Sequence, residues 1–148
     1  MFMDKIQKTE LGTIQKVTVE KMNFLYMEVS NDPESQQKAW PEFESRFPSL
    51  TGRKMYGLDY DGKKVYRVCS LVLDSDNEET FGLEQFTFEG GTYIRLRLKL
   101  DPPELYEKIG PAYGYLFSQY EEEINWSLPM IKQYKVKNIL DIMIPISN

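Results

Sequence analysis

Alternating apolar and polar side chains predict two strands near the start of the chain. Residues 14–20 alternate in this way, and in residues 24–30 the side chains of Leu25, Met27 and Val29 share one face. A period of two is typical of a β-strand that buries one face. We therefore expect two strands separated by a short turn.

A helical pattern follows directly. Asp32 is a suitable N-cap, and Pro33 suits the first helical position. The predicted helix continues to about residue 46, and its apolar stripe consists of Trp40, Phe43 and Phe47. Pro41 removes one backbone hydrogen bond, so we expect a kink or a short break there.

Two further strands and a linker complete the first half of the chain. Residues 53–60 and 64–73 flank Asp61-Gly62, a dipeptide typical of hairpin turns. The polar and acidic segment 74–79 then predicts a solvated linker. The predicted order is strand, strand, helix, strand, strand.

The second half repeats this order. Strands are predicted at residues 83–89, 92–100, 127–135 and 139–146, and Asp101 is expected to cap a helix between the second and third of them. Because the same order of elements occurs twice, the two halves have the pattern of one duplicated unit.

The repeat extends to single residues. Prolines recur at a spacing of 70 positions, Pro33 with Pro103 and Pro41 with Pro111. Two amphipathic helices share some pattern by chance. A proline inside a helix costs about 3 kcal/mol, however, so one at the ninth position of both helices is rare.

The duplication predicts the fold. Half-domains at about residues 14–73 and 83–146 would form one α+β domain, with antiparallel sheets, two helices and a central groove. The boundary between duplicated halves is a favoured place for a ligand pocket.

Composition narrows the function classes. The net charge of −5 disfavours binding to nucleic acid, which depends on clustered Lys and Arg. The chain has no histidine and one cysteine, Cys69, which disfavours His-dependent catalysis, a metal site and a disulfide. It also has no apolar run of membrane-spanning length and no secretory signal. We therefore expect a cytoplasmic protein without a cofactor.

Aromatic residues make up 14% of the chain, and many fall on the predicted helix stripes or adjacent strands. Such rings either stack on flat ligands in a groove or pack in the core. Core packing suits the phenylalanines better, and both interpretations stay open for Tyr56, Tyr113, Trp126 and Tyr134. Gly57 indicates a strand bulge or a close approach to the backbone. The candidate ligand-binding residues are Trp40, Phe43, Tyr56, Gly57, Tyr93, Tyr113, Phe117, Trp126 and Tyr134.

Five motifs occur in a fixed order along the chain. They are Trp40-Pro41-Glu42-Phe43, Gly52 followed by Met55-Tyr56-Gly57, Gly91-Thr92-Tyr93, Leu128-Pro129-Met130-Ile131-Lys132-Gln133-Tyr134 and Asp141-Ile142-Met143-Ile144-Pro145-Ile146. From about Gln15 onward, the chain resembles the GyrI-like small-molecule-binding domain, the effector-binding module of AraC-type and MerR-type multidrug-responsive bacterial regulators. The resemblance implies a groove along a pseudo-twofold axis that binds bulky, often cationic, aromatic compounds.

The resemblance adds Lys132 to the candidate ligand-binding residues. In many members an acidic residue stands two positions before the final tyrosine of the fourth motif, here Tyr134, and faces the groove. A lysine at this position implies a preference for neutral or anionic ligands, a charge supplied by another carboxylate, or loss of ligand binding.

Three functions follow from this resemblance. We predict a non-enzymatic protein that binds or senses aromatic, hydrophobic, drug-like molecules and has no DNA-binding segment of its own. One alternative is a protein-interaction module, such as a gyrase-modulating protein. The other is a hydrolase of reactive small molecules, which the absence of histidine and of an acid at Lys132 disfavours.

Overall fold

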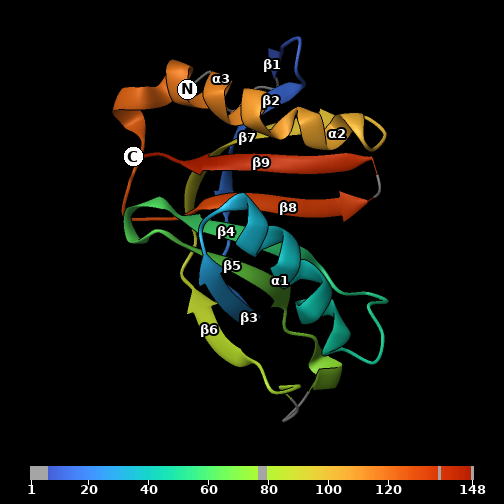
Figure 1. Ribbon diagram of the computed structural model, residues 1–148. Coiled ribbons are helices and arrows are strands. Elements are labelled where there is room, and N and C mark those ends of the chain that lie inside the picture. The colour runs from blue at the N-terminus through green and yellow to red at the C-terminus, as the bar shows by residue number, and fades with distance from the viewer. Residues whose placement is uncertain (1–6, 77–79, 137, 148) are drawn as a thin grey trace.

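The computed structural model describes residues 7–76, 80–136 and 138–147 and confirms an α+β fold. Its strands are β1 (Gln7–Lys8), β2 (Thr13–Val19), β3 (Met22–Ser30), β4 (Met55–Tyr60), β5 (Val65–Leu71), β6 (Glu84–Phe88), β7 (Gly91–Lys99), β8 (Met130–Val136) and β9 (Ile139–Pro145). Its helices are α1 (Pro33–Ser45), α2 (Glu104–Glu107) and α3 (Ile109–Tyr120). Within the described residues, the strands form one nine-stranded antiparallel sheet rather than separate sheets (Figure 1).

The strand order is symmetric about the centre of the sheet. Across the sheet the strands run β1-β2-β7-β9-β8-β4-β5-β3-β6. Apart from β1, exchanging each strand of the first half with its counterpart in the second half only reverses this order. The pair β4 and β8 lies at the centre, so an approximate twofold axis passes between these strands. This is the arrangement expected of a duplicated chain.

The first strand of each half pairs with the other half. β2 pairs with β7, and β6 pairs with β3. Both pairings keep the same register, and they are separated by the bend between β2 and β3 and between β6 and β7. At this bend Gly90 has a φ of 93°, and a Cβ there would lie 2.5 Å from the carbonyl oxygen of Val19. Only glycine suits both conditions. The exchange of strands joins the halves into one body.

The helices α1 and α3 cover the same face of the sheet (Figure 1). Phe43 of α1 packs with Leu25 of β3, and Leu116 of α3 packs with Ile94 of β7. The alternate side chains of these strands point to the opposite face, where Tyr93 lies in a third buried cluster. The predicted alternation of strand faces is therefore confirmed, and it separates residues near the helices from those behind the sheet.

The first helix begins as predicted. The Oδ1 atom of Asp32 accepts a hydrogen bond from the backbone N–H of Ser35 at 2.8 Å, and Pro33 opens the helix. The helix is continuous through Pro41, so the expected break does not occur. No helix in the described part of the chain is long and apolar enough to cross a membrane.

The second predicted helix is divided into α2 and α3. Asp101 does not cap it, because Pro103 occupies the N-cap position of α2 and no side chain caps that end. In a continuous helix, the ring of Pro111 would clash with the backbone carbonyl of the residue four positions earlier. That residue is Glu107, where α2 ends.

Part of the acidic linker is buried. The structure describes the segment only as far as Asp76, whose side chain is 3% exposed. Its carboxylate accepts two hydrogen bonds from the guanidinium of Arg53, and the Nη1–Oδ2 distance is 3.0 Å. Arg53 also lies 4.1 Å from the ring centroid of Phe47. The prediction of a solvated linker is therefore wrong at Asp76, because this carboxylate neutralises a buried arginine.

Candidate functional site

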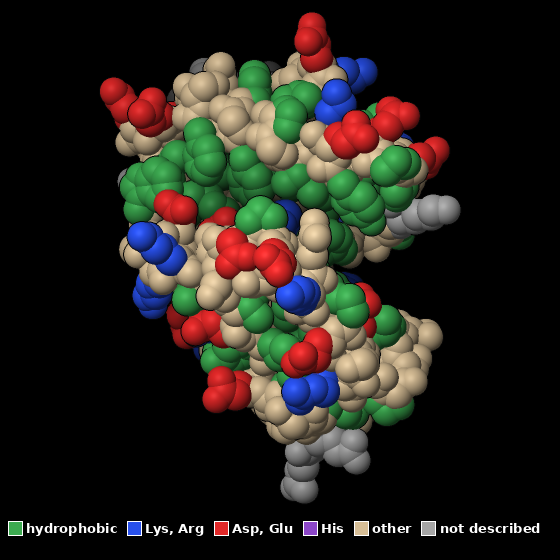
Figure 2. All heavy atoms as spheres, in the orientation of Figure 1, with side chains coloured by type: hydrophobic (Ala, Val, Ile, Leu, Met, Phe, Trp, Pro, Cys, Tyr) green, Lys and Arg blue, Asp and Glu red, His purple; other side chains and the backbone are tan. Residues whose placement is uncertain are grey.

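A groove lies between the two halves of the molecule, over the central strands β4 and β8. It has a volume of about 810 Å³ and separates α1 from α2 and the start of α3. Figure 2 shows the hollow between the part of the molecule around α1 and the part around α2 and α3. The residues that line it are Pro33, Gln36, Gln37, Trp40, Glu44, Met55, Tyr106, Ile109, Lys132 and Tyr134.

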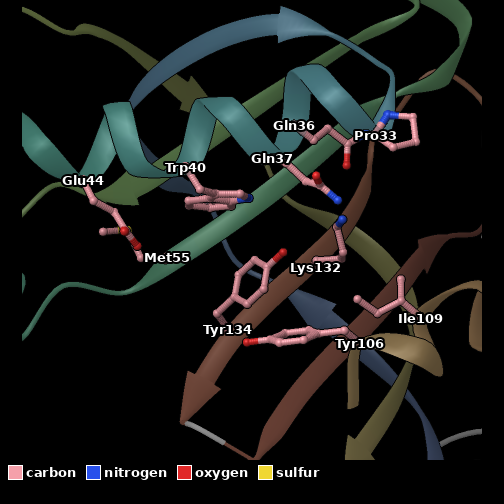
Figure 3. Close-up of a pocket in the computed structure, with 10 residues that line it drawn as sticks. All are labelled: Pro33, Gln36, Gln37, Trp40, Glu44, Met55, Tyr106, Ile109, Lys132 and Tyr134. Carbon is pink, nitrogen blue, oxygen red and sulfur yellow. The ribbon is translucent and has the colours of Figure 1, made fainter. Parts of the chain in front are cut away.

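Three aromatic rings form much of the apolar wall (Figure 3). Trp40 comes from α1, Tyr106 from α2 and Tyr134 from β8. The rings of Trp40 and Tyr134 meet edge to face, with centroids 5.2 Å apart. Tyr106 is 55% exposed, so the two helices leave a ring surface open to a bound molecule.

Lys132 supplies a positive charge to the floor of the groove. Its side chain is half-buried and lies on the helix-covered face of β8, and Figure 3 shows it directed towards Gln37. Its Nζ atom is 5.0 Å from the centroid of the Tyr66 ring. Burial lowers the pKa of Lys132, and Asp59 partly offsets this effect. In the described residues, no hydrogen bond or ion pair engages this ammonium group.

Tyr66 lies beneath this part of the groove. The side chain is fully buried, and its hydroxyl has no hydrogen-bond partner among the described residues. Burial raises the pKa of Tyr66 far above its usual value, and nearby Tyr134 adds to the rise. The hydroxyl is therefore an un-ionised donor without an acceptor.

Gly57 makes room for Tyr66. A Cβ on Gly57 would overlap the Tyr66 hydroxyl oxygen, so the tyrosine crosses β4 only because that position is glycine. Gly57 pairs regularly with Val68 on one side and with Lys132 on the other. Of the two interpretations of Gly57, the structure supports a close approach to the backbone and not a strand bulge.

A polar chain links the start of α1 to β4. Asn31 donates from Nδ2 to Oδ1 of Asp59 at 2.6 Å, and Gln36 donates from Nε2 to Oδ1 of Asn31 at 2.7 Å. Burial raises the pKa of Asp59, although the hydrogen bond from Asn31 opposes the rise. These contacts hold the Asp59 carboxylate near the helix start and position Gln36 at the groove.

Of the ten candidate residues, the structure brings three to the groove wall and one beneath it. Trp40, Lys132 and Tyr134 line the groove, and Gly57 lies beneath it in β4, covered by Tyr66. The remaining six are packed elsewhere. They are Phe43, Tyr56, Tyr93, Tyr113, Phe117 and Trp126.

Each of these six has a different environment from the groove. Phe43 is fully buried beneath α1, while Tyr56 and Tyr93 lie behind the sheet in the third cluster. Tyr93 donates its hydroxyl to the carbonyl of Pro129 at 2.8 Å, so its polar atom is satisfied there.

The other three of the six lie around α3. Tyr113 and Phe117 pack against the core beneath that helix. Trp126 is 57% exposed and stacks on Phe117, with centroids 6.1 Å apart. The groove-lining residues therefore do not include the aromatic side of α3.

Sequence reasoning missed seven lining residues, and two signals in the chain point to some of them. Trp40 and Glu44 lie one helical turn apart, and Pro33, Gln36 and Gln37 continue that face towards the start of α1. Tyr106 lies 70 positions after Gln36, at the spacing of the repeated prolines. Met55 belongs to the second of the five ordered motifs, and no comparable sequence signal identifies Ile109.

Comparisons with known proteins identify the fold. No family model matches the chain, and no curated protein matches it. The structure of SAV2435 bound to tetraphenylphosphonium is similar over 91% of this chain and 94% of that one, with 13% identity and a TM-score of 0.64. The C-terminal domain of EcmrR is similar over 97% and 98%, with 15% identity and a TM-score of 0.67.

A third similar structure is a hydrolase from Listeria innocua. The similarity extends over 90% of this chain and 91% of the hydrolase chain, with 16% identity and a TM-score of 0.55. At these identities the similarity establishes the fold, which proteins with different activities share. The chain therefore shares its fold with the ligand-bound SAV2435 and the C-terminal domain of EcmrR, in agreement with the fold that its ordered motifs predict.

Proposed function

We propose that this protein binds aromatic small molecules in the groove between its halves, as a sensor or a sequestering protein, without changing them chemically. The observation that carries the proposal is an open groove of about 810 Å³ whose wall includes Trp40, Tyr106 and Tyr134. This volume lies in the range of pockets for drug-sized ligands, about 300–1,000 Å³.

The composition of the groove suits such ligands. Aromatic rings offer large flat surfaces for stacking, and the hydroxyls of Tyr106 and Tyr134 add polar contacts. Met55 contributes an adaptable apolar side chain at the end beyond Trp40 (Figure 3). A flat molecule with one or two polar groups therefore fits this wall better than a sugar or a highly charged metabolite does.

Proteins of similar fold support the proposal. The SAV2435 structure has tetraphenylphosphonium, an aromatic cation, bound to it. EcmrR has a domain of similar fold at its C-terminus. Their low identity to this chain leaves the ligand to be found by experiment.

Tryptophan fluorescence tests the proposal directly, because one of the two tryptophans lies in the groove. In the Trp126→Phe variant, Trp40 is the sole reporter; in Trp40→Phe, only the exposed Trp126 remains. We expect members of a panel containing tetraphenylphosphonium, rhodamine 6G and anilinonaphthalene sulfonate to quench Trp40 saturably, with Kd below about 1 mM. Trp126 should not respond saturably. Absence of saturable binding across the panel would refute the proposal.

Hydrolysis is the main catalytic alternative, because one protein of similar structure is named a hydrolase. Glu44 supplies a carboxylate and Lys132 an amine to the groove wall. The proposal predicts that p-nitrophenyl acetate is hydrolysed no faster by the native protein than by its Glu44→Gln or Lys132→Met variant. Turnover that is lost in either variant would support the enzyme instead.

A further inference from the structure

We infer that the groove selects aromatic ligands that carry one anionic group, such as a carboxylate, and that this group lies against the ammonium of Lys132. The inference rests on the proposed function and adds the charge of the ligand. The inferred ligand charge is negative, whereas the tetraphenylphosphonium ion bound to SAV2435 is positive.

The first observation is that the charge of Lys132 has no ion-pair or hydrogen-bond partner in the described residues, although its Nζ atom lies 5.0 Å from the centroid of the Tyr66 ring. Each of the five ion pairs in the described residues involves other groups, and no acceptor hydrogen-bonds to the Lys132 Nζ atom. The side chain is half-buried on a central strand, where an uncompensated ammonium is costly. An anion bound in the groove would provide the missing partner.

Asp59 is not that partner. It acts on Lys132 electrostatically, but the two side chains do not form an ion pair. Its Oδ1 atom instead accepts the short hydrogen bond from Asn31 at the start of α1. The carboxylate is therefore held away, and the ammonium stays available to a ligand.

The second observation is the unpaired hydroxyl of Tyr66. This buried group lies over Gly57, beside the strand that carries Lys132. The Lys132 ammonium on the groove wall and the Tyr66 hydroxyl buried beneath it are therefore neighbouring donor groups. Neighbouring donors of this kind create a positive potential that favours a negative ligand group and disfavours a cation.

The position of Glu44 limits the ligand to one anionic group. In Figure 3, Glu44 lies at the far end of the groove, beyond Trp40 and next to Met55, while Lys132 lies at the other end near Gln37. A ligand whose anion contacts Lys132 places its aromatic body along Trp40 and Tyr134. A second anion at the opposite end would meet a carboxylate.

Three naphthalene compounds of similar shape test the inference by calorimetry at neutral pH: 2-naphthoate, 2-naphthamide and 2-naphthylmethylammonium. We expect naphthoate to bind about ten-fold more tightly than the neutral amide, since a hydrogen bond to a charged group contributes about 1.5 kcal/mol or more. The ammonium compound should bind most weakly. Added salt should weaken binding of naphthoate but not of the amide.

Variants assign the preference to Lys132. Lys132→Met keeps an apolar side chain of similar length and should reduce the affinity for naphthoate to that of the amide, while Lys132→Arg should retain the preference. Lys99→Met is the matched control, because it removes the same charge from an exposed position of β7 that does not line the groove, and it should leave naphthoate affinity unchanged.

Each outcome separates the inference from the proposed function. Equal binding of all three compounds, preference for the ammonium compound, or a preference that survives Lys132→Met would overturn the inference while leaving aromatic binding intact. Binding of none of the three, together with no response in the dye panel, would overturn the proposed function itself.

Discussion

Single residues at the centre of the sheet decide the chemistry of the groove. Gly57, Tyr66 and Lys132 lie on three neighbouring strands, and each depends on the others. The glycine admits the tyrosine, and the tyrosine ring lies 5.0 Å from the lysine Nζ atom. The motif containing Gly57 predicts either a strand bulge or a close approach to the backbone. The identity of Tyr66 depends on strand pairing, which no local pattern specifies.

The contact between Gly57 and Tyr66 leads to a stability prediction. Gly57→Ala should lower the free energy of unfolding by about 1–3 kcal/mol, because the added methyl group overlaps the tyrosine hydroxyl in a packed site. Urea denaturation measures this change. Gly114→Ala is the control: a Cβ at that position of α3 meets nothing within 4 Å, so stability should stay the same or rise. Equal effects of both substitutions would contradict the contact.

Lys132 gives the proposed ligand preference a pH dependence. Its folded-state pKa is lowered, so the ammonium loses its proton at a lower pH than a lysine in water, whose pKa is near 10.5. Affinity for naphthoate should therefore be highest below that lowered pKa and fall as pH rises through it. For the same reason, stability without ligand should rise between the folded and unfolded pKa values.

Calorimetry across alkaline pH measures this dependence. Among the groups near Lys132, the pKa of Tyr134 is raised to about 12 by burial and that of Tyr66 is raised further, so both stay neutral in this window. Burial raises the pKa of Asp59, and the hydrogen bond from Asn31 opposes this rise. Naphthoate affinity that does not change until the pH exceeds 10.5 would contradict the assignment to Lys132.

At the level of elements, local patterns predict the strands well and the ends of helices less well. Alternation identifies the strand faces, and Asp32 caps α1 as expected. Alternation also separates Gly57 from its neighbour Tyr56, which points behind the sheet, once the buried face is known. The division between α2 and α3 depends on prolines and on packing together, since Pro41 stays inside a continuous helix while Pro111 does not.

The buried pair of Arg53 and Asp76 ties the end of the first half to β4. Asp76→Ala should lower the free energy of unfolding by about 3 kcal/mol, because it leaves the guanidinium of Arg53 buried without its counter-ion. The exposed Asp74→Ala provides a matched control, with an expected change within about 0.5 kcal/mol. Similar losses in both variants would contradict a specific role for the pair.

The same pair contributes to acid sensitivity. Hydrogen bonds from Arg53 lower the pKa of Asp76 below its usual value of 3.8. Its contribution is therefore complete above that value and is lost as pH falls through the lower, folded-state pKa. The difference in unfolding free energy between native protein and Asp76→Ala should shrink in that acidic range.

The whole molecule is organised around the junction between its halves. The prolines at a spacing of 70 positions predict duplication, and the symmetric strand order agrees with it. The exchange of β2 and β6 between halves does not follow from the repeat, because pairing within a half and pairing across halves produce the same alternation. For that reason, sequence reasoning predicts a groove but assigns several core rings to it.

Substitution of each tryptophan in turn distinguishes ligand binding in the groove from general adsorption to the protein surface. Trp40→Ala should weaken binding of aromatic ligands about ten-fold, since it removes a stacking surface from the wall. Trp126→Ala removes an exposed ring that stacks on Phe117 outside the groove and should leave affinity unchanged. Calorimetry with 2-naphthoate distinguishes the two. Equal losses would indicate adsorption to exposed aromatic surface.

The most direct measurement is a crystal structure of the protein with 2-naphthoate bound. The account predicts the naphthalene ring between α1 and β8, in contact with Trp40 and Tyr134, and a carboxylate oxygen within hydrogen-bond distance of the Lys132 Nζ atom. A ligand bound outside the groove would contradict the proposed binding site, and a carboxylate directed away from Lys132 would contradict the proposed basis of selectivity.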